Sequence, residues 1–256
     1  MAWTINNGKL YFNSKLYTGN GGTNVVTGVG FNSDFTWIKN RATTGNPALF
    51  DKINGVTKYL NSNNQNGLAT SAPTLTAWSS DGFTIGSSTD LNGNGNGIAS
   101  WNWLANGAGS ANTDGDINST VSANTTSGFS IVTYTGTGSN ATIGHGLGAA
   151  PSMIIVKDLS EDNYDWMVYH QSLGATKYIR LNLTSAVSTS TVWQDTAPTN
   201  QVFSVVSNSS DVNKSGNNFI AYCFANVQGF SKMGSYVGNG STNGTFIYTG
   251  FRPAFA

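Results

Sequence analysis

Charged residues are scarce in this sequence of 256 residues. Lys and Arg together number 12, Asp and Glu also number 12, and charged residues make up only 9% of the chain. An average soluble domain has about 25%. Because the net charge is zero, the composition offers no basic stripe that would release counterions from a phosphate backbone. We therefore expect no nucleic acid partner.

Long apolar runs and cysteine pairs are also missing. The longest apolar stretches, such as residues 153–156, are far shorter than the ~18 residues of a membrane helix, so we expect no membrane span. Cys223 is the only cysteine, which excludes an internal disulfide and predicts a small buried core side chain. The N-terminus has neither the basic segment nor the apolar run of a signal peptide, so none is expected.

Glycine is abundant, with 31 residues, and Asn, Ser and Thr are frequent beside it. These residues disfavour helices, and no apolar helical period persists for three turns. Apolar and polar residues alternate instead at 82–85 and 129–134, with turn residues on either side. The pattern predicts an all-β chain with almost no helix, built as antiparallel β-sandwiches of the jelly-roll type.

One motif recurs three times along the chain, at residues 16–21 (LYTGNG), 133–138 (TYTGTG) and 235–240 (SYVGNG). Other segments keep the same register, for example 55–60 (GVTKYL) with 174–179 (GATKYI). The period of roughly 100 residues is too long for the coils of a β-solenoid, which repeat every 20–30 residues or so. Tandem sandwich repeats are therefore the favoured architecture.

The copies predict a division into three parts. Residues 1–106 form a first β-sandwich repeat with its N-terminal strand, and 107–229 a linker with a second repeat. Residues 230–256 begin a third, truncated repeat, and we expect the natural protein to continue beyond it. Each copy is expected to open with a short strand, at Phe12, Phe129 and Phe230. Residues 106–112 read as a flexible linker by composition.

His145 and His170 are the two histidines and the first candidates for a general base. Neither recurs in the first copy, where Thr27 and Asp51 occupy the corresponding positions. We therefore interpret His145 as a turn residue and His170 as a surface or half-buried residue rather than as catalytic groups.

Four carboxylates, which could include the acid pair of a glycosidase, lie in one stretch: Asp158, Glu161, Asp162 and Asp165. The corresponding segment of the first copy, 40–46, contains no acid. We therefore expect a solvated loop there, and no catalytic residue anywhere in the chain.

Residues 90–96 and 112–118 carry Asp and Asn oxygens at short spacing, as a calcium loop requires. Neither segment has the acid that completes an EF-hand, and Asp or Asn before Gly also forms turns without any ion. Calcium stays an open alternative, and no cofactor is expected.

Several residues recur in both copies and are candidates for either scaffold or ligand contacts. They are Lys39 with Lys157, and the Lys-Tyr pairs at 58–59 and 177–178. Lysine in a strand often protects a sheet edge or covers apolar surface. Core packing is the expected role of Trp37, Trp101 and Trp103, although exposed aromatics could stack on sugar rings.

The second copy resembles a repeat family found in virion structural and tail-fibre-like proteins of marine bacteriophages. The resemblance covers nearly the whole chain and is carried by residues 134–136 (YTG), 144–148 (GHGLG), 169–178 (YHQSLGATKY), 221–224 (AYCF) and 229–232 (GFSK). It implies tandem sandwiches similar to those of concanavalin A-like lectins and glucanases. It implies no reaction and supplies no catalytic residues, and kinship with lectins is an analogy of fold alone.

The resemblance places the protein in the virion, as a non-enzymatic part of a tail fibre or other appendage with a structural or host-attachment role. Its expected partners are other virion proteins and a host-surface glycan, and a homo-oligomer, preferably a trimer, is expected. Two alternatives remain open: a carbohydrate-binding module of a longer depolymerase, and a capsid decoration protein. Recognition is expected in the loops that differ between copies, at 40–46, 61–80, 158–165 and 185–201.

Overall fold

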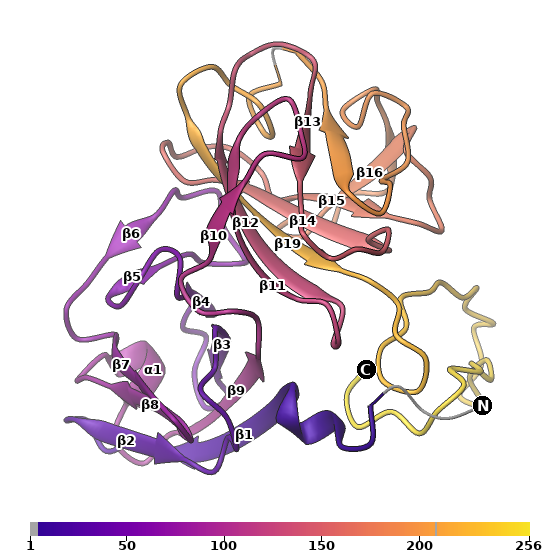
Figure 1. Cartoon of the computed structure of the whole chain (residues 1–256). Coiled ribbons are helices and arrows are strands. Elements are labelled where there is room, and N and C mark those ends of the chain that lie inside the picture. Colours follow the sequence, from indigo (N-terminus) through magenta and orange to yellow (C-terminus); the bar gives the residue numbers. More distant parts are fainter. Residues whose placement is uncertain (1–4, 208) are drawn as a thin grey trace.

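The computed structural model describes residues 5–207 and 209–256, and almost all of its regular structure is antiparallel β-sheet (Figure 1). The helices among these residues are α1 (Thr89–Asn92) and a single 3-10 turn (Gly8–Leu10). None is long and apolar enough to cross a membrane. The predicted all-β class with almost no helix is confirmed. Residues 1–4, at the start of the predicted first repeat, lie outside the described residues.

The first half of the chain places two sheets face to face. The larger has the order β1-β9-β3-β4, with β1 (Phe12–Thr18), β9 (Gly97–Trp103), β3 (Phe35–Asn40) and β4 (Ala48–Asp51). The smaller has the order β2-β8-β7, with β2 (Asn24–Thr27), β8 (Gly82–Ile85) and β7 (Leu75–Ser79). β5 (Lys58–Tyr59) and β6 (Ala69–Thr70) form a short pair. Phe50, Phe83 and Ile98 fill the core between the sheets.

The second half has one large sheet covered by a strand pair. The large sheet has the order β10-β11-β12-β19-β14-β15-β16-β17. Its strands are β10 (Ser110–Asn112), β11 (Ser119–Asn124), β12 (Phe129–Thr135), β19 (Asn218–Phe224), β14 (Met153–Asp158), β15 (Met167–His170), β16 (Lys177–Arg180) and β17 (Ser188–Thr189). The covering pair is β13 (Ala141–Gly144) and β18 (Val202–Val205), and Tyr134, Trp193 and Phe203 pack between the two layers.

Corresponding strands have the same neighbours in both halves. The order β1-β9-β3-β4 of the first half matches β12-β19-β14-β15 of the second, and the pair β2-β8 matches β13-β18. The two strands predicted from alternation, at 82–85 and from Phe129, are β8 and β12. The strand order therefore agrees with the register of the sequence copies.

The recurring tyrosine motif has the same contact in both halves. The Tyr17 hydroxyl donates to the Leu91 carbonyl at 2.7 Å, and the Tyr134 hydroxyl donates to the Val212 carbonyl at 2.7 Å. Burial raises the pKa of both tyrosines, so the hydroxyls stay protonated donors. The tyrosine thus ties the first strand of each copy to the turn before its last strand.

A buried asparagine follows each acceptor carbonyl and holds the glycine-rich turn. The Asn92 carboxamide accepts from Asn20 N at 3.0 Å and donates to the Gly22 carbonyl at 2.6 Å. In the second half the Asn213 carboxamide accepts from Thr137 N at 3.0 Å and donates to Ser139 O at 2.6 Å. We call the Tyr17–Asn92 and Tyr134–Asn213 arrangements the turn clasps.

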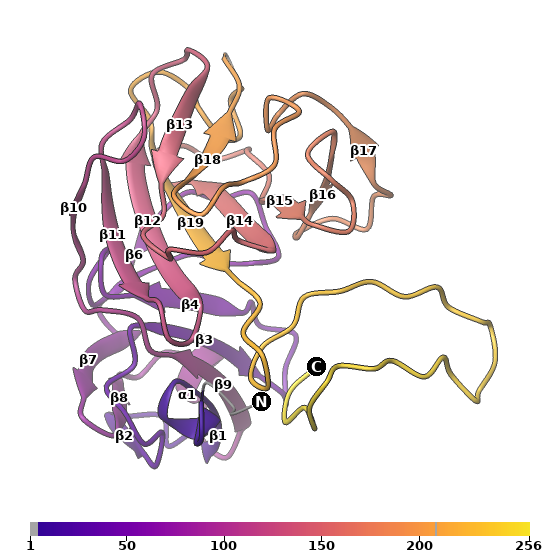
Figure 2. The same cartoon turned by 45° about the vertical axis from the view of Figure 1, so that its right-hand side comes forward.

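The large sheets of the two halves face each other and share a third core, the inter-half core (Figure 2). Phe35 of β3 packs against Tyr222 of β19, with ring centroids 4.4 Å apart, and against Phe129 of β12 at 5.8 Å. The large sheet of the second half is therefore covered on both faces. This explains why residues 153–156 are apolar without alternation, since a strand covered on both sides needs no polar face.

Two expectations about the boundaries of the repeats are wrong. The predicted flexible linker at 106–112 contains strand β10, whose Ala111 pairs with Thr120 of β11, and Asn106 N donates to Ser122 Oγ at 2.8 Å. No strand is assigned at Phe230 or in the rest of the described segment 230–256, which runs as an extended loop beside the body (Figure 2). In both complete copies the opening strand pairs with the closing strand β9 or β19, and residues 230–256 contain no counterpart of that closing strand.

Candidate functional site

A groove opens where the inter-half core ends. Its volume is about 730 Å³, and both halves contribute to it. We call it the junction groove. The first half lines it with Ile53, Asn54, Lys58 and Leu68, and the second half with Ala111, Asn118, Ser119, Thr120, Thr133, Tyr134, Thr135, Leu159, Ser160 and Asn218.

The polar floor of this groove follows from the alternation of β12. Phe129 and Ile131 point into the inter-half core. Thr133 and Thr135 continue the same face of the strand, because side chains two residues apart lie on one side of a sheet. Thr120 of β11 is the cross-strand partner of Thr133. The face therefore changes from apolar to hydroxyl-bearing at the point where the first half no longer covers it.

Several groups in the groove have unused hydrogen-bonding capacity. Among residues 5–207 and 209–256, the hydroxyls of Thr120 and Thr133, the Asn118 carboxamide and the Lys58 ammonium have no hydrogen-bond partner. The Asn218 oxygen accepts from the Thr135 hydroxyl at 2.9 Å. The groove thus presents donors and acceptors that a ligand can use.

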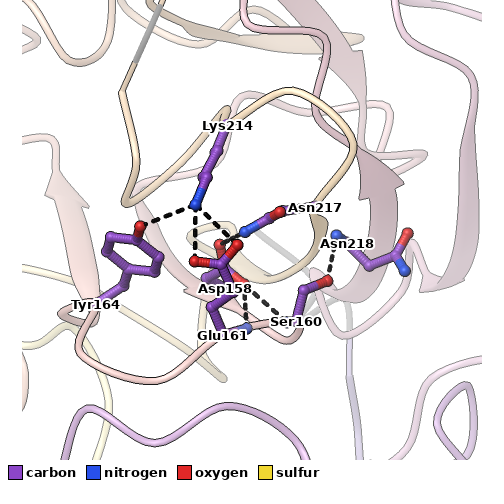
Figure 3. Close-up of polar contacts among 7 residues, drawn as sticks. All are labelled: Asp158, Ser160, Glu161, Tyr164, Lys214, Asn217 and Asn218. Atoms are coloured by element: carbon purple, nitrogen blue, oxygen red, sulfur yellow. Dashed lines mark hydrogen bonds and ion pairs between the residues drawn. The ribbon is translucent and has the colours of Figure 1, made fainter.

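The acidic segment 158–165 lies at one end of the groove and begins with a buried turn cap (Figure 3). Asp158 Oδ1 accepts from the backbone nitrogens of Ser160 at 2.7 Å and Glu161 at 3.1 Å, and its Oδ2 accepts from Asn217 Nδ2 at 2.7 Å. Asn40, in the corresponding position of the first half, accepts from Ala42 N at 2.9 Å. Asp158 is therefore a structural cap, as Asn40 is.

Glu161 is engaged with a lysine on the facing loop (Figure 3). Lys214 Nζ lies 2.7 Å from both carboxylate oxygens and donates to the Tyr164 hydroxyl at 3.1 Å. The hydrogen bond from Lys214 lowers the pKa of Glu161, and the same contact raises the pKa of Lys214. Both groups are charged at neutral pH and neutralise each other.

Asp162 and Asp165 connect the halves. Asp162 Oδ1 accepts from Gly67 N at 2.8 Å, and Asp165 Oδ1 accepts from Gln65 Nε2 at 2.8 Å. Arg180 forms an ion pair with Asp165 at 2.8 Å. The expectation of a solvated loop holds for Asp162, which is exposed. It fails for Asp158, which is buried, and for Asp165, whose carboxylate accepts from Gln65 of the first half.

Lys39 and Lys157 play one role in the two halves. Lys39 Nζ donates to Thr43 O at 3.1 Å, and Lys157 Nζ donates to Tyr164 O at 2.8 Å and Gln65 O at 2.9 Å. Both lie on internal strands, β3 and β14, so of the two scaffold roles considered for a strand lysine, protection of a sheet edge does not apply. Each lysine holds the loop that follows its strand. Burial lowers the pKa of Lys157 to about 8, although nearby Asp158 opposes this shift.

Both histidines hold turns. His145 is buried, its Nε2 faces Thr199 O at 3.2 Å, and its Nδ1 accepts from Leu147 N at 3.2 Å. Burial lowers its pKa, so the ring is neutral with the proton on Nε2. Nδ1 of the half-buried His170 accepts from Ser172 N at 3.2 Å. These contacts leave neither ring facing the junction groove.

Of the other predicted candidates, Lys58, Asn118 of the 112–118 segment, and Leu68, Leu159 and Ser160 of the predicted recognition loops 61–80 and 158–165 line the groove. In the 112–118 segment Asn112 Oδ1 accepts from Asp114 N at 3.1 Å, and Asp116 Oδ2 accepts from the Thr142 hydroxyl at 2.8 Å. Asn92 of segment 90–96 belongs to a turn clasp. Across the described part of the chain, no three His, Cys, Asp or Glu side chains gather in a group that could hold a metal ion.

The tryptophans and Cys223 lie mainly in cores. Trp37 and Trp103 are partly buried against the inter-half core, as predicted. Trp101 is half-buried, 6.4 Å from the Trp37 ring and 6.0 Å from Phe255. Cys223 is a buried free thiol whose pKa is raised to about 12 by burial. This confirms the predicted core role of the cysteine.

Sequence reasoning missed the residues that form the groove floor. Thr120 and Thr133 attract no attention in a chain rich in threonine. The comparison of copies carried one signal, because Leu16 occupies the position of Thr133 in the first copy. That replacement removes a hydroxyl from an otherwise matched strand.

Comparison with known proteins gives one match. No curated protein and no solved structure matches the chain. A family model described as a domain of unknown function, DUF7483, matches residues 7–256. The chain therefore belongs to the DUF7483 family of domains of unknown function.

Proposed function

We propose that the protein is a non-enzymatic component of a bacteriophage virion, part of a tail fibre or another appendage, with a structural and host-attachment role. Two observations support this role: the family resemblance of the second copy, and the way in which the two halves pack together. The observation that carries it is the inter-half core, which makes the two halves one continuous body.

The contacts between the halves are suited to a load-bearing element. Besides the shared core, Trp166 Nε1 donates to Asn61 O at 3.0 Å, and Leu68 N donates to Leu159 O at 2.9 Å. Independent domains on a linker move relative to each other unless a large apolar interface joins them. The inter-half core is such an interface and supports a stiff module.

The engagement of the ionisable groups supports a structural and binding role. His145, Asp158 and Asp165 each hold backbone or amide groups in place, and Lys214 neutralises Glu161. A general acid or base needs a free lone pair or proton within reach of a substrate. These side chains use their lone pairs and protons in structural hydrogen bonds instead.

A carbohydrate-binding module of a longer depolymerase is the second candidate, and the junction groove favours it. A capsid decoration protein is the third, and it differs from the first only in its place on the particle. Fibres favour three-fold assembly, whereas decoration follows the lattice of the capsid.

Immunogold labelling of purified phage particles, with antibodies raised against this chain, tests the proposal. Label on tails or fibres is the expected result. Label spread over the capsid would favour decoration instead. Particles that carry no label, while the same antibody detects the purified chain, would contradict a virion role.

A further inference from the structure

We propose that the junction groove is a binding site for an uncharged oligosaccharide segment. The inference rests on the proposed attachment role and adds the site and the class of ligand. Three features of the groove carry it: a cross-strand pair of free hydroxyls, apolar lining residues from both halves, and little net charge.

The hydroxyl pair comes from neighbouring strands. Thr120 and Thr133 are direct partners in the β11–β12 ladder, and both side chains are half-buried. Each hydroxyl can donate and accept, and neither has a partner among the described residues. Partly buried hydroxyls without partners gain more from a ligand hydroxyl than exposed ones do, because less water competes for them.

The lining also has apolar members. Ile53 and Leu68 from the first half and Leu159 from the second line the groove together with the threonines. Sugar rings have both faces of C–H groups and rims of hydroxyls. A groove with apolar patches and a few fixed polar groups is the usual form of a small-molecule site. The arrangement therefore matches the two-sided character of a pyranose.

The lining offers little charge with which to hold a strongly anionic ligand. Among the described residues, Lys58 is the only charged one that lines the groove. Acidic neighbours of the lining include Asp51, which accepts from Asn54 Nδ2 at 2.8 Å, and the 158–165 segment. Glu161 of that segment is paired with Lys214. One exposed ammonium cannot supply the multiple contacts with which phosphate-rich polymers are held.

The threonine pair has no counterpart in the first half of the chain. Leu16 stands in the first half where Thr133 stands in the second, and β1 has no neighbour on its outer side that corresponds to β11. The threonine pair is therefore not a requirement of the repeated scaffold. The groove volume of about 730 Å³ lies within the ~300–1,000 Å³ of typical ligand sites.

The test uses the full chain on an array of immobilised neutral oligosaccharides and bacterial surface polysaccharides, followed by calorimetric titration of the best neutral ligand. The double variant Thr120→Val, Thr133→Val removes both hydroxyls and keeps the side-chain shape. Thr18→Val is the matched control, because Thr18 is an exposed threonine at the end of β1. Circular dichroism and thermal melting check that each variant is folded.

The expected result is binding of a neutral glycan that weakens at least 10-fold in the double variant and is unchanged in Thr18→Val. If the double variant does not fold, the single variants Thr120→Val and Thr133→Val replace it, and each is expected to weaken binding by about 3-fold or more. Thr120→Ser with Thr133→Ser, which retains the hydroxyls, is expected to leave neutral-glycan binding within about 3-fold. Absence of binding to every glycan, preference for anionic glycans only, or full binding by the double variant overturns the inference. Virion labelling is independent of these results, so failure of the groove and failure of the virion role can be distinguished.

Discussion

Tyr222 of β19 donates a hydrogen bond to Asp51 at the end of β4, at 3.1 Å and across 171 residues of sequence. Both side chains are buried. Asp51 also accepts from Asn54 N at 2.8 Å, so the same carboxylate caps a turn of the first half and receives a donor from the second. Burial raises the pKa of both groups. The contact therefore couples a local turn to the inter-half core.

Replacing Tyr222 by Phe should destabilise the protein by about 1–3 kcal/mol, because a buried carboxylate loses one donor while the ring packing against Phe35 is kept. Urea denaturation followed by tryptophan fluorescence measures the change. Tyr236→Phe is the control, since Tyr236 is 66% exposed, and it should have no effect. Equal stability of the Tyr222→Phe variant and the wild type would show that the contact carries no weight.

Lys157 should make stability depend on pH in the alkaline range. Its folded pKa is about 8, below the ~10.4 of an unfolded lysine, so between these values the unfolded chain binds more protons than the folded chain. Stability from this group is therefore lowest below pH 8 and rises towards pH 10, by at most about 1.4 kcal/mol per pH unit.

Denaturant titrations at pH 7, 8, 9 and 10 measure this trend in the wild type and in Lys157→Met. The variant should lose the rise, although it is less stable overall because Gln65 O and Tyr164 O lose their donor. Lys177→Met, which changes an exposed lysine, should retain it. Parallel pH profiles for the wild type and Lys157→Met would count against the lowered pKa.

The turn clasps should not tolerate a methyl group at the glycine two residues after each tyrosine. A Cβ at Gly19 would lie 2.2 Å from Gly93 O, and one at Gly136 would lie 2.3 Å from Lys214 O. Gly19→Ala and Gly136→Ala should each cost about 3 kcal/mol or more, because backbone must move in both cases. Gly234→Ala, with open space around its Cβ, should be neutral. Thermal melting distinguishes these outcomes, and an unchanged melting temperature in Gly136→Ala would refute the close approach.

Much of the fold could be predicted from the sequence because its signals are local. Alternation at 82–85 and from Phe129 predicted two strands, since apolar side chains on one face require period two. The copies predicted equivalent roles for residues such as Tyr17 and Tyr134, and both make the same hydrogen bond. Strand β10 was missed because its glycine-rich, polar segment becomes a strand only through pairing with β11.

The candidate site was harder to predict because it depends on contacts between distant segments. Ile53 and Thr133 line one groove only because the large sheets face each other. The capping role of Asp158 was easier to predict, because Asn40 occupies the equivalent position and makes the same kind of turn contact. The contacts of Asp162 and Asp165 with the first half have no signal in the local sequence.

Differential scanning calorimetry of the full chain tests most directly whether the two halves form one continuous body. The inter-half core predicts a single unfolding transition whose calorimetric enthalpy equals its van't Hoff enthalpy. Phe35→Ala, which removes a ring at the centre of this core, should lower the temperature of that transition. Two separate transitions in the wild-type protein would contradict the claim.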